Sequence, residues 1–294
     1  MDFRQYLAGQ QKRVDAELDR LVPPETAPPE TIHRAMRYSL FAGGKRIRPL
    51  LCLEAARCVA GPAEGAVAAA CSLELIHTYS LIHDDLPALD NDDYRRGKLT
   101  CHKMFGEAMA ILAGDALLTL AFRVLATLDG VSDQARVRMI AELSEASGTA
   151  GGMIGGQVAD LEGEGRPPTA ALLESIHRAK TGALLRASVR LGAIHGGADA
   201  GQYQALSAYG EHIGLAFQIV DDVLDVEQSS EALGKTAGKD AQQRKITFPA
   251  VYGLAESKRM ARQEWEKAGQ ALDGFGERAQ RLRELAELIV SRTA

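Results

Sequence analysis

Residues 63–85 read AEGAVAAACSLELIHTYSLIHDD, and on a helix their apolar side chains point to every side. A helix that is apolar all round lies in the core of a large protein rather than at its surface. Residues 108–128, AMAILAGDALLTLAFRVLATL, and residues 206–226, LSAYGEHIGLAFQIVDDVLDV, have the same character. These three segments predict an all-α protein built around buried helices.

The remaining sequence also favours helices. Ala, Leu, Glu and Arg are abundant, aromatic residues make up only 5% of the chain, and no segment alternates like a strand. Pro and Gly break the pattern at 22–30, 59–65, 164–169 and 196–201, in stretches too short to link domains. We therefore expect a single domain over residues 1–294, with roughly ten or more helices around a central active-site cavity.

The composition narrows the class of protein further. With 294 residues, 46% of them hydrophobic, the chain can bury a large core. Its net charge of -5 argues against a nucleic-acid binder, and no stretch reaches the ~18 uncharged apolar residues of a membrane span. The N-terminus is charged and amphipathic, unlike a signal peptide. The four cysteines show no CxxC pairing, so we expect reduced thiols in a cytoplasmic protein.

Acidic residues gather where the first of these apolar helices should end. Residues 83–97 read HDDLPALDNDDYRRG, which places Asp84 and Asp85 at the helix end and Asp90 shortly after them. The spacing to Asp90 is poor helical register, but Pro87 should interrupt the helix and let a loop carry Asp90 back. The stretch predicts a compact group of carboxylates.

A similar motif follows near the end of another apolar helix. In FQIVDDVLDVEQ, Asp221 and Asp225 are four residues apart and share a helix face, with Asp222 beside them. Such crowded carboxylates repel one another unless a cation is present, and oxygen ligands suit Mg2+, which commonly bridges carboxylates to substrate phosphates. One motif alone fits solvated helix caps equally well. Two copies at helix C-termini, where the helix dipole disfavours carboxylates, favour two metal sites facing one cavity.

Basic residues occur near these motifs and elsewhere. The loop FAGGKRIRP combines glycines, which let a backbone approach a ligand, with arginines, whose forked donors match phosphate. A solvated loop is the alternative, and Arg95 and Arg96 could also simply pair with the aspartates. His77 lies about two turns before Asp84 and shares its face. Acidic and basic groups beside apolar helices suit a substrate with a diphosphate head and an apolar tail.

These residues together resemble the trans-isoprenyl diphosphate synthases, most closely the bacterial short-chain farnesyl diphosphate synthases. A lone DDxxD is a weak signal, whereas an ordered set of motifs along nearly the whole chain is a strong one. The matching segments are GGKRIRP (43–49), SLIHDDLPALDNDDYRRG (80–97), ILAGDALLTLAF (111–122), GGQVADL (155–161), KTGALLRAS (180–188), FQIVDDVLD (217–225) and GKTAGKDAQQRKITFPA (234–250).

The resemblance implies a role for each matching residue. The two aspartate motifs would bind Mg2+ ions, with Mn2+ as the alternative, that clamp the allylic diphosphate: Asp84, Asp85, Asp90, Asp221, Asp222 and Asp225. Further residues would hold that same diphosphate: Arg95, Lys180, Lys235 and, more weakly matched, Lys245. A separate pocket would hold the isopentenyl diphosphate head group: Lys45, Arg48, His77 and Arg96. Polar groups near the developing allylic cation would come from Thr181 and Gln218, and Gln157 and Asp160 line the same cavity in relatives.

The implied reaction is ionisation of an allylic diphosphate, condensation with isopentenyl diphosphate, then loss of a proton. Dimethylallyl and geranyl diphosphate would be the allylic substrates, farnesyl diphosphate the product and a homodimer the assembly. Tyr79 and Ser80 lie about one helical turn before Asp84, where short-chain relatives place a bulky residue that limits the product. An ordinary core tyrosine is the alternative for Tyr79.

Other functions remain open at this point. A geranylgeranyl diphosphate synthase would differ only in the depth of its tunnel. A class I terpene cyclase would not need GGKRIRP or the arginine pair, which serve a second diphosphate. A non-catalytic subunit would be expected to have lost acidic motifs, and a simple cation binder would hold Mg2+ without diphosphate. The chain ends IVSRTA, without the basic tail that closes the site in many relatives.

Overall fold

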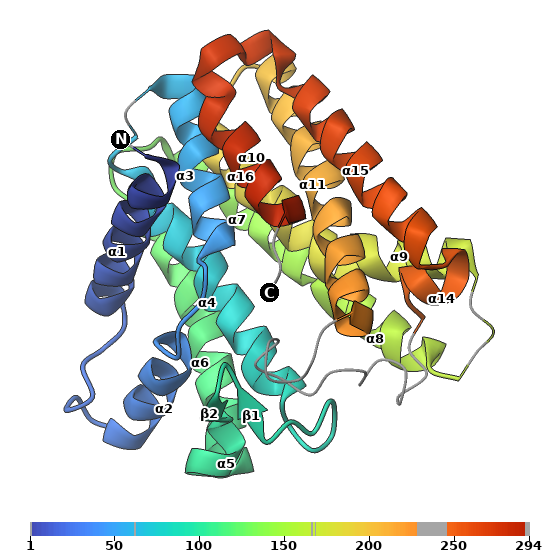
Figure 1. The fold of residues 1–294 in the computed structure, drawn as a ribbon. Coiled ribbons are helices and arrows are strands. Elements are labelled where there is room, and N and C mark those ends of the chain that lie inside the picture. The colour runs from blue at the N-terminus through green and yellow to red at the C-terminus, as the bar shows by residue number, and fades with distance from the viewer. Residues whose placement is uncertain (1, 62, 166, 168, 228–245, 292–294) are drawn as a thin grey trace. The chain divides into compact units, whose positions relative to one another are not determined.

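A computed structural model describes residues 2–61, 63–165, 167, 169–227 and 246–291 of the chain. Contacts divide the chain into two compact units. Unit 1 comprises Met1–Leu50 and Glu64–Ile140, and unit 2 comprises Leu51–Ala63 and Ala141–Ala294. The described residues are overwhelmingly helical, which confirms the all-α prediction (Figure 1). The expectation of a single domain stays a prediction.

Unit 1 is built around one buried helix, α4. Its elements are α1 (Phe3–Leu21), α2 (Glu30–Leu40), the start of α3 (Ile47–Ala60), α4 (Ala66–Asp84), β1 (Tyr94–Arg95), β2 (Lys98–Leu99), α5 (Cys101–Phe105), α6 (Glu107–Ala126) and the start of α7 (Asp133–Ser147). Helix α4 contacts α1, α2 and α6, and most of its side chains are buried. Figure 1 shows α6 beside α4 along much of its length. The prediction of a core helix over 63–85 is confirmed.

Helix α6 differs from the expectation of a fully buried helix. Ala113, Leu117 and Ala121 lie on its buried side, whereas Ile111 and Leu112 are 44% and 50% exposed. Its apolar character therefore does not mean burial on all sides. Among the described helices, α6 alone is long and apolar enough to cross a membrane by length and composition, a test that helices of soluble proteins also pass.

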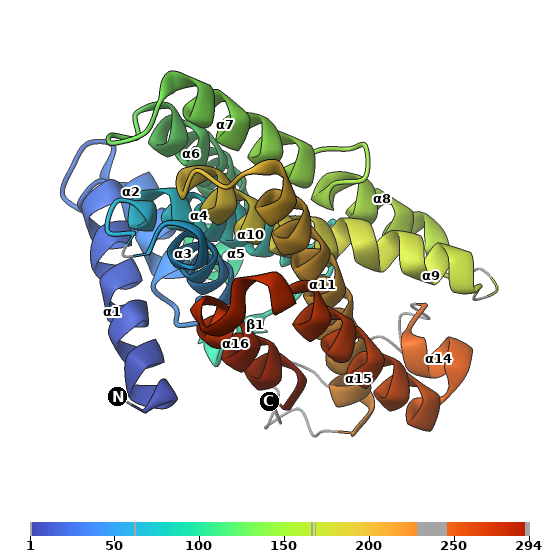
Figure 2. The same ribbon diagram turned by 90° about the horizontal axis from the view of Figure 1, so that it is seen from above.

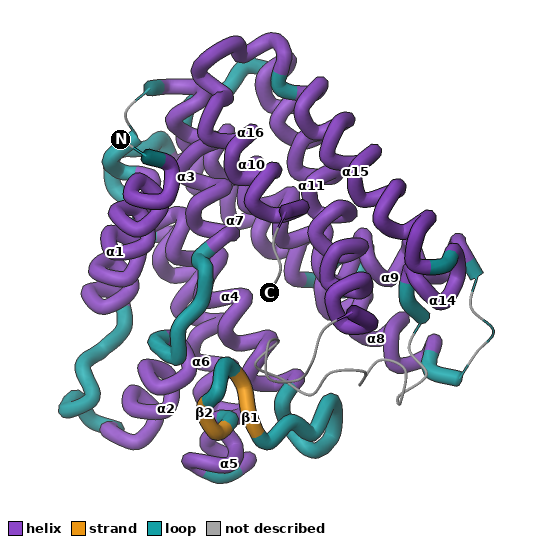
Figure 3. Tube along the Cα trace, viewed as in Figure 1, coloured by secondary structure: helices purple, strands orange, loops and turns teal. Residues whose placement is uncertain are grey.

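No segment of the sequence predicted a strand, yet the described residues include a short hairpin (Figure 3). Strand β1 pairs antiparallel with β2, so that Tyr94 faces Leu99 and Arg95 faces Lys98. The turn residues Arg96 and Gly97 have φ angles of 53° and 74°. Two consecutive positive φ angles are the signature of the tightest hairpin turns. Each strand has only two residues, which is too short for an alternating sequence pattern to be recognised.

Unit 2 is organised around the long helix α11. Its elements are the ends of α3 and α7, α8 (Met153–Gly163), α9 (Ala170–His177), the π-helix η1 (Arg178–Gly182), α10 (Ala183–His195), α11 (Ala200–Glu227), α14 (Phe248–Tyr252), α15 (Leu254–Ala271), the 3-10 segment η2 (Asp273–Ala279) and α16 (Gln280–Ser291). Helix α11 contacts α10, α14, α15, α16 and η1. Figures 1 and 2 both show α15 running beside α11.

Glycines allow close packing of helices within unit 2. A side chain added at Gly192 of α10 would meet the carbonyl oxygen of Cys52 in α3 at 2.1 Å. Gly214 of α11 similarly faces the backbone of Gly182 in η1, where an added Cβ would lie 3.1 Å from the Gly182 Cα. The second contact brings α11, which carries one acidic motif, against the π-helix.

The four cysteines are all buried and free, as expected for structural thiols. Burial raises the pKa of Cys52 to about 12, so its thiol is unreactive near neutral pH. The predicted breaks also fall between helices, since α1 ends at Leu21, α8 at Gly163 and α10 at His195.

Candidate active site

The first acidic motif begins where α4 ends, at Asp84. The loop beyond Pro87 then turns back on the helix end, because the N–H of Asp90 donates to the carbonyl of Asp84 at 2.8 Å. The N–H of Asp92 donates in the same way to the carbonyl of Asp85 at 3.2 Å. These bonds confirm that the loop carries Asp90 back to the end of the helix.

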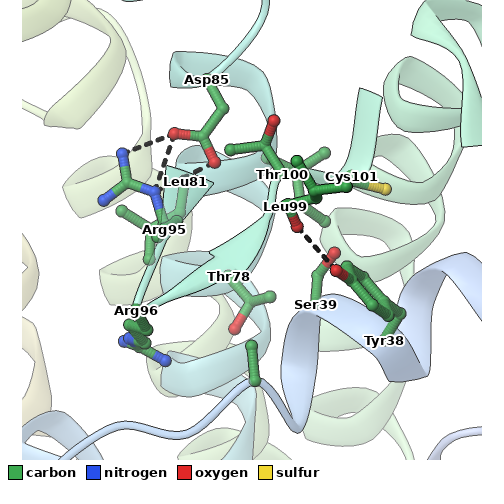
Figure 4. A pocket seen from close by; sticks show the side chains of 12 residues that line it. Tyr38, Ser39, Thr78, Leu81, Asp85, Arg95, Arg96, Leu99, Thr100 and Cys101 are labelled. Carbon is green, nitrogen blue, oxygen red and sulfur yellow. Dashed lines mark hydrogen bonds and ion pairs between the residues drawn. The ribbon is translucent and has the colours of Figure 1, made fainter. Parts of the chain in front are cut away.

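Arg95 of the hairpin holds the Asp85 carboxylate (Figure 4). Its Nε lies 2.8 Å and 3.0 Å from the two oxygens of Asp85, and its Nη2 lies 2.6 Å from Oδ1. Burial raises the pKa of Asp85, and the hydrogen bond and charge of Arg95 oppose that rise. The pairing of an arginine with one of the aspartates, left open by the sequence, is therefore present in the structure.

A cavity of about 30 Å3 lies beside this pair, with walls from α2, α4 and the hairpin (Figure 4). Tyr38, Thr78, Asp85, Arg95 and Cys101 are among its lining residues. Its volume is that of about one water molecule. The cavity itself is too small to hold a prenyl diphosphate.

The glycine-rich loop 43–49 packs against the second hairpin arginine. Arg96 donates from Nη1 to the carbonyl of Gly43, and a Cβ at Gly44 would lie 2.7 Å from the same nitrogen. Gly44 also has a φ of 135°, a conformation that other residues rarely adopt. The second glycine of GGKRIRP is therefore required by the backbone conformation, and a larger residue there would also displace the Arg96 guanidinium.

Arg46 of the same loop is a structural residue. Its guanidinium is buried and lies 2.7 Å from Glu74 and 2.8 Å from Asp15, and it donates to the carbonyl of Leu40. Its φ of 53° is unusual for a residue other than glycine. These contacts hold the loop in place at Arg46. Lys45, which is exposed, precedes this position and Arg48 follows it.

His77 of α4 is buried and is affected by the charges of four arginines. Its pKa is lowered well below the usual value by burial and by the positive charges of Arg48, Arg96, Arg95 and Arg46, in that order. The ring is therefore neutral near pH 7. Loop 43–49, the hairpin and α4 thus gather guanidinium groups around one histidine, an arrangement suited to a multiply charged anion.

Tyr79 is buried at 5% exposure, one helical turn before Asp84. Its ring meets that of His83 edge to face, with the centroids 5.7 Å apart, and its hydroxyl has no hydrogen-bond partner among the described residues. Burial, together with the charge of Asp84, raises its pKa to about 12. Next to it, Ser80 donates to the carbonyl of His77. A buried hydroxyl without a partner is uncommon in a core tyrosine.

The second acidic motif lies near the C-terminal end of α11, as predicted. Asp222 and Asp225 are buried and Asp221 is partly exposed. The carboxylate of Asp222 accepts hydrogen bonds from the side chain of Gln218 and from the backbone of Phe248, each at 2.9 Å. The sequence predicted the positions of these aspartates but not the partners of Asp222.

Lys180 and Thr181 lie on the π-helix η1, a rare geometry that often marks functional sites. The ammonium of Lys180 lies 2.6 Å from the carboxylate of Asp160 on α8. Helix α8 comes this close because Gly156 has no side chain: a Cβ there would lie 2.2 Å from the backbone nitrogen of Lys180. The motif GGQVADL drew attention to Asp160, but only the fold identifies Lys180 as its partner.

The remaining predictions concern metal ions and the loop after α11. Lys235 and Lys245 lie outside the described residues. No group of three or more His, Cys, Asp or Glu side chains within the described part of the chain is placed to hold a metal ion unaided. The donors of the acidic motifs are nevertheless carboxylate oxygens, which suit a hard cation that takes its other ligands from substrate phosphates. That the two motifs face one cavity stays a prediction.

An all-α chain with two aspartate motifs, and with arginines acting on His77 of the helix that ends at the first motif, is the arrangement expected of a helical enzyme that acts on diphosphates. Residues 29–287 match the family model described as polyprenyl synthetase. One similar protein is a dimethylallyltranstransferase of Fischerella ambigua, which is 50% identical over 98% of this chain and 83% of that protein. Another is a farnesyl diphosphate synthase of Geobacillus stearothermophilus, which is 49% identical over 88% of this chain and 87% of that protein. The solved geranylgeranyl pyrophosphate synthetase of Pyrococcus horikoshii superposes with a TM-score of 0.90, at 31% identity over 99% of this chain and 98% of that one.

The chain therefore belongs to the polyprenyl synthetase family. It is a trans-prenyltransferase of the kind that makes farnesyl or geranylgeranyl diphosphate, and the family uses divalent metal ions to bind the diphosphate. The relatives are named for products of different chain length, so their names do not decide between a farnesyl and a geranylgeranyl product.

Proposed function

We propose that this enzyme condenses isopentenyl diphosphate with dimethylallyl and then geranyl diphosphate to give (2E,6E)-farnesyl diphosphate. The observation that carries the proposal is the group of guanidinium charges around neutral His77, on the helix that ends at the first acidic motif. Cations and carboxylates side by side within unit 1 suit a diphosphate that binds both directly and through metal ions.

Within unit 1, the isopentenyl head group binds to Lys45, Arg48, His77 and Arg96. His77 is neutral and therefore donates a hydrogen bond without adding a charge, while the arginines supply the charge. Arg96 is oriented by its bond to the Gly43 carbonyl, and Arg46 anchors loop 43–49 through its ion pair with Glu74. Arg95 exchanges part of its contact with Asp85 for the allylic diphosphate.

Within unit 2, Lys180 holds the allylic diphosphate, together with Lys235 and, more weakly, Lys245. Thr181 and Gln218 turn their polar groups toward the carbon that becomes positive. The ion pair with Asp160 keeps the Lys180 ammonium in place before substrate arrives.

The metal ions, for which we propose Mg2+ with Mn2+ as the alternative, supply charge that stabilises the departing diphosphate. The carboxylates that would hold them are Asp84, Asp85, Asp90, Asp221 and Asp225, with Asp222 considered separately below. Arg95 and Lys180 add hydrogen bonds to the same leaving group as its charge grows. The apolar helices exclude water from the allylic cation. A proton is finally lost from the condensed product, and the released diphosphate is its acceptor.

Product length depends on Tyr79, with Ser80 beside it. A growing chain that points from the diphosphate site along α4 meets the Tyr79 ring about one turn below Asp84, which suits a fifteen-carbon limit. A geranylgeranyl product is the second candidate, because the Pyrococcus horikoshii enzyme of that name has so similar a fold. We also propose that the enzyme is a cytoplasmic homodimer of single-domain chains.

The proposal is tested by incubating the protein with isopentenyl diphosphate and either dimethylallyl or geranyl diphosphate, with and without Mg2+. The products are dephosphorylated and separated by chromatography. Farnesol that appears only with Mg2+ is the expected result. Geranylgeraniol as the main product would contradict the role of Tyr79 as the limit, and a cyclic hydrocarbon or no turnover would contradict the reaction itself.

A further inference from the structure

Asp222 lies on a different face of α11 from the other two aspartates of the second motif. Asp221 and Asp225 are four residues apart and share one face of α11, whereas Asp222 is about 100° further round the helix. Its side chain is only 3% exposed. The middle aspartate therefore points into the packing of unit 2.

Three protein groups from the described residues contact the Asp222 carboxylate. The side-chain nitrogen of Gln218 donates to Oδ1 at 2.9 Å, and the backbone N–H of Phe248 donates to Oδ2 at 2.9 Å. The Nε2 atom of His177 lies 3.2 Å from Oδ2. Both oxygens thus have a partner supplied by the protein, and a metal ion bound there would have to compete with these groups.

His177 is a buried residue to which the reaction gives no role. Its side chain is 8% exposed, and its ring stacks on Phe248 with the centroids 5.3 Å apart and the planes at 21°. Its Nε2 is buried and makes no hydrogen bond of good geometry within the described chain, and its nearest carboxylate is that of Asp222, 3.2 Å away. His177 is also the last residue of α9, directly before the π-helix that carries Lys180 and Thr181.

These contacts connect one carboxylate to two parts of the proposed site. Because Asp222 accepts from the Gln218 nitrogen, the orientation of that amide is fixed, with its oxygen on the opposite side. Because Asp222 also contacts His177, it ties the start of η1 to α11. Phe248 contacts both residues: its backbone N–H donates a hydrogen bond to Asp222, and its ring stacks on that of His177.

We propose that Asp222 and His177 are positioning residues: Asp222 orients Gln218 and, through His177, the turn that carries Lys180 and Thr181, and it is not a metal ligand. The roles of Gln218, Lys180 and Thr181 in this statement rest on the proposed function. The contact between Asp222 and His177 does not depend on it.

The test compares Asp222→Asn, His177→Leu, the double variant and Asp221→Asn, in two measurements. The first is denaturant unfolding of the metal-free protein in EDTA. The loss of stability in the double variant should be clearly smaller than the sum of the two single losses, because both changes weaken the same contact. Additive losses of stability would contradict an interaction between Asp222 and His177. His177→Gln, which keeps a side-chain N–H, replaces His177→Leu if that variant does not fold.

The second measurement is turnover as a function of Mg2+ concentration. Asp222→Asn and His177→Leu should each lower kcat about tenfold, non-additively, with the Mg2+ concentration for half-maximal rate unchanged. Asp221→Asn should raise that concentration, and His177→Gln should recover part of kcat. A raised Mg2+ requirement in Asp222→Asn would make Asp222 a ligand, and an unchanged kcat in His177→Leu would make the pair merely structural. If the wild-type protein shows no turnover, the proposed function fails while the unfolding measurement still decides the pair.

Discussion

The two acidic motifs each begin with a pair of aspartates and add a third shortly after, but their surroundings differ. In the first, Asp85 is held by a guanidinium from a two-stranded hairpin, and a backbone turn brings Asp90 to the helix end. In the second, all three aspartates lie on one continuous helix, and Asp222 is held by groups from α9, α11 and α14. The first motif is therefore held by a loop and the second by packed helices.

This difference shows how one pattern can serve two tasks. We expect the bond between Asp85 and Arg95, which lies beside a small cavity, to rearrange when a diphosphate binds. The buried contacts of Asp222 are better suited to fixing geometry before the substrate binds. Two aspartate-rich motifs, DDLPALD (84–90) and DDVLD (221–225), thus indicate a diphosphate enzyme without assigning the same role to each aspartate.

The largest effect is expected from the first motif. Asp84→Asn should lower kcat by about 10²–10³-fold. The change removes a carboxylate that would bind the metal ion, and the metal ion would stabilise the negative charge of the departing diphosphate. Asp93→Asn is the matched control in the same stretch, since Asp93 is exposed and pairs with the surface residue Lys103. Steady-state kinetics at saturating Mg2+ should separate the two, and equal losses would contradict a specific role for Asp84.

A smaller effect should follow from releasing Lys180 in unit 2. Asp160→Asn removes the partner of the Lys180 ammonium and should raise KM for the allylic substrate about tenfold, because a freed lysine no longer presents its charge in one place. KM for isopentenyl diphosphate should stay unchanged. Glu211→Gln, which breaks the exposed pair with Arg178 on the same turn, is the control. A rise in both KM values alike would point to general damage.

Tyr79 should affect product length more than rate. Tyr79→Ala is expected to shift the main product from farnesyl to geranylgeranyl diphosphate, because it removes the ring below the first motif. Tyr79→Phe should keep the product and raise the free energy of unfolding by about 1 kcal/mol, since the hydroxyl is buried without a partner in the described chain. Product chromatography and denaturant unfolding measure the two effects. An unchanged product in Tyr79→Ala would remove Tyr79 from this role.

The smallest effect concerns the protonation of His77. Its pKa is lowered well below the usual value, so the ring should stay neutral and its NMR signal constant between about pH 6 and 8. In Arg48→Gln one positive charge is lost, and the pKa of His77 should rise because its protonated form is then less disfavoured. A wild-type signal that titrates near pH 6.5 would contradict the positive environment found around His77.

Much of the fold could be predicted because it depends on local patterns. The core helix α4, the breaks at Pro and Gly, and the return of Asp90 after Pro87 follow from residues that are near one another in sequence. The exposure of one side of α6 could not be predicted, because an apolar sequence does not specify what covers it. The hairpin was missed since its turn depends on positive φ angles at Arg96 and Gly97.

The candidate site was predictable as a set of residues but not as a set of contacts. The sequence offered Lys180 and noted Asp160, yet their pairing depends on the approach of α8 at Gly156. His177 was missed altogether, because a histidine on an apolar helix gives no signal of its own. Its importance comes from Asp222 and Phe248, which lie far from it in sequence.

The most direct test of the account is a calorimetric titration with Mg2+, performed with the protein alone and with the protein plus inorganic diphosphate, after subtraction of the heat of Mg2+ binding to diphosphate alone. We expect weak binding to the protein alone, since the described carboxylates form no complete metal site, and much tighter binding with diphosphate, which supplies the missing ligands. Tight binding without diphosphate would identify a simple cation binder. Equally weak binding in both titrations would contradict the assignment of the acidic motifs to a metal–diphosphate site.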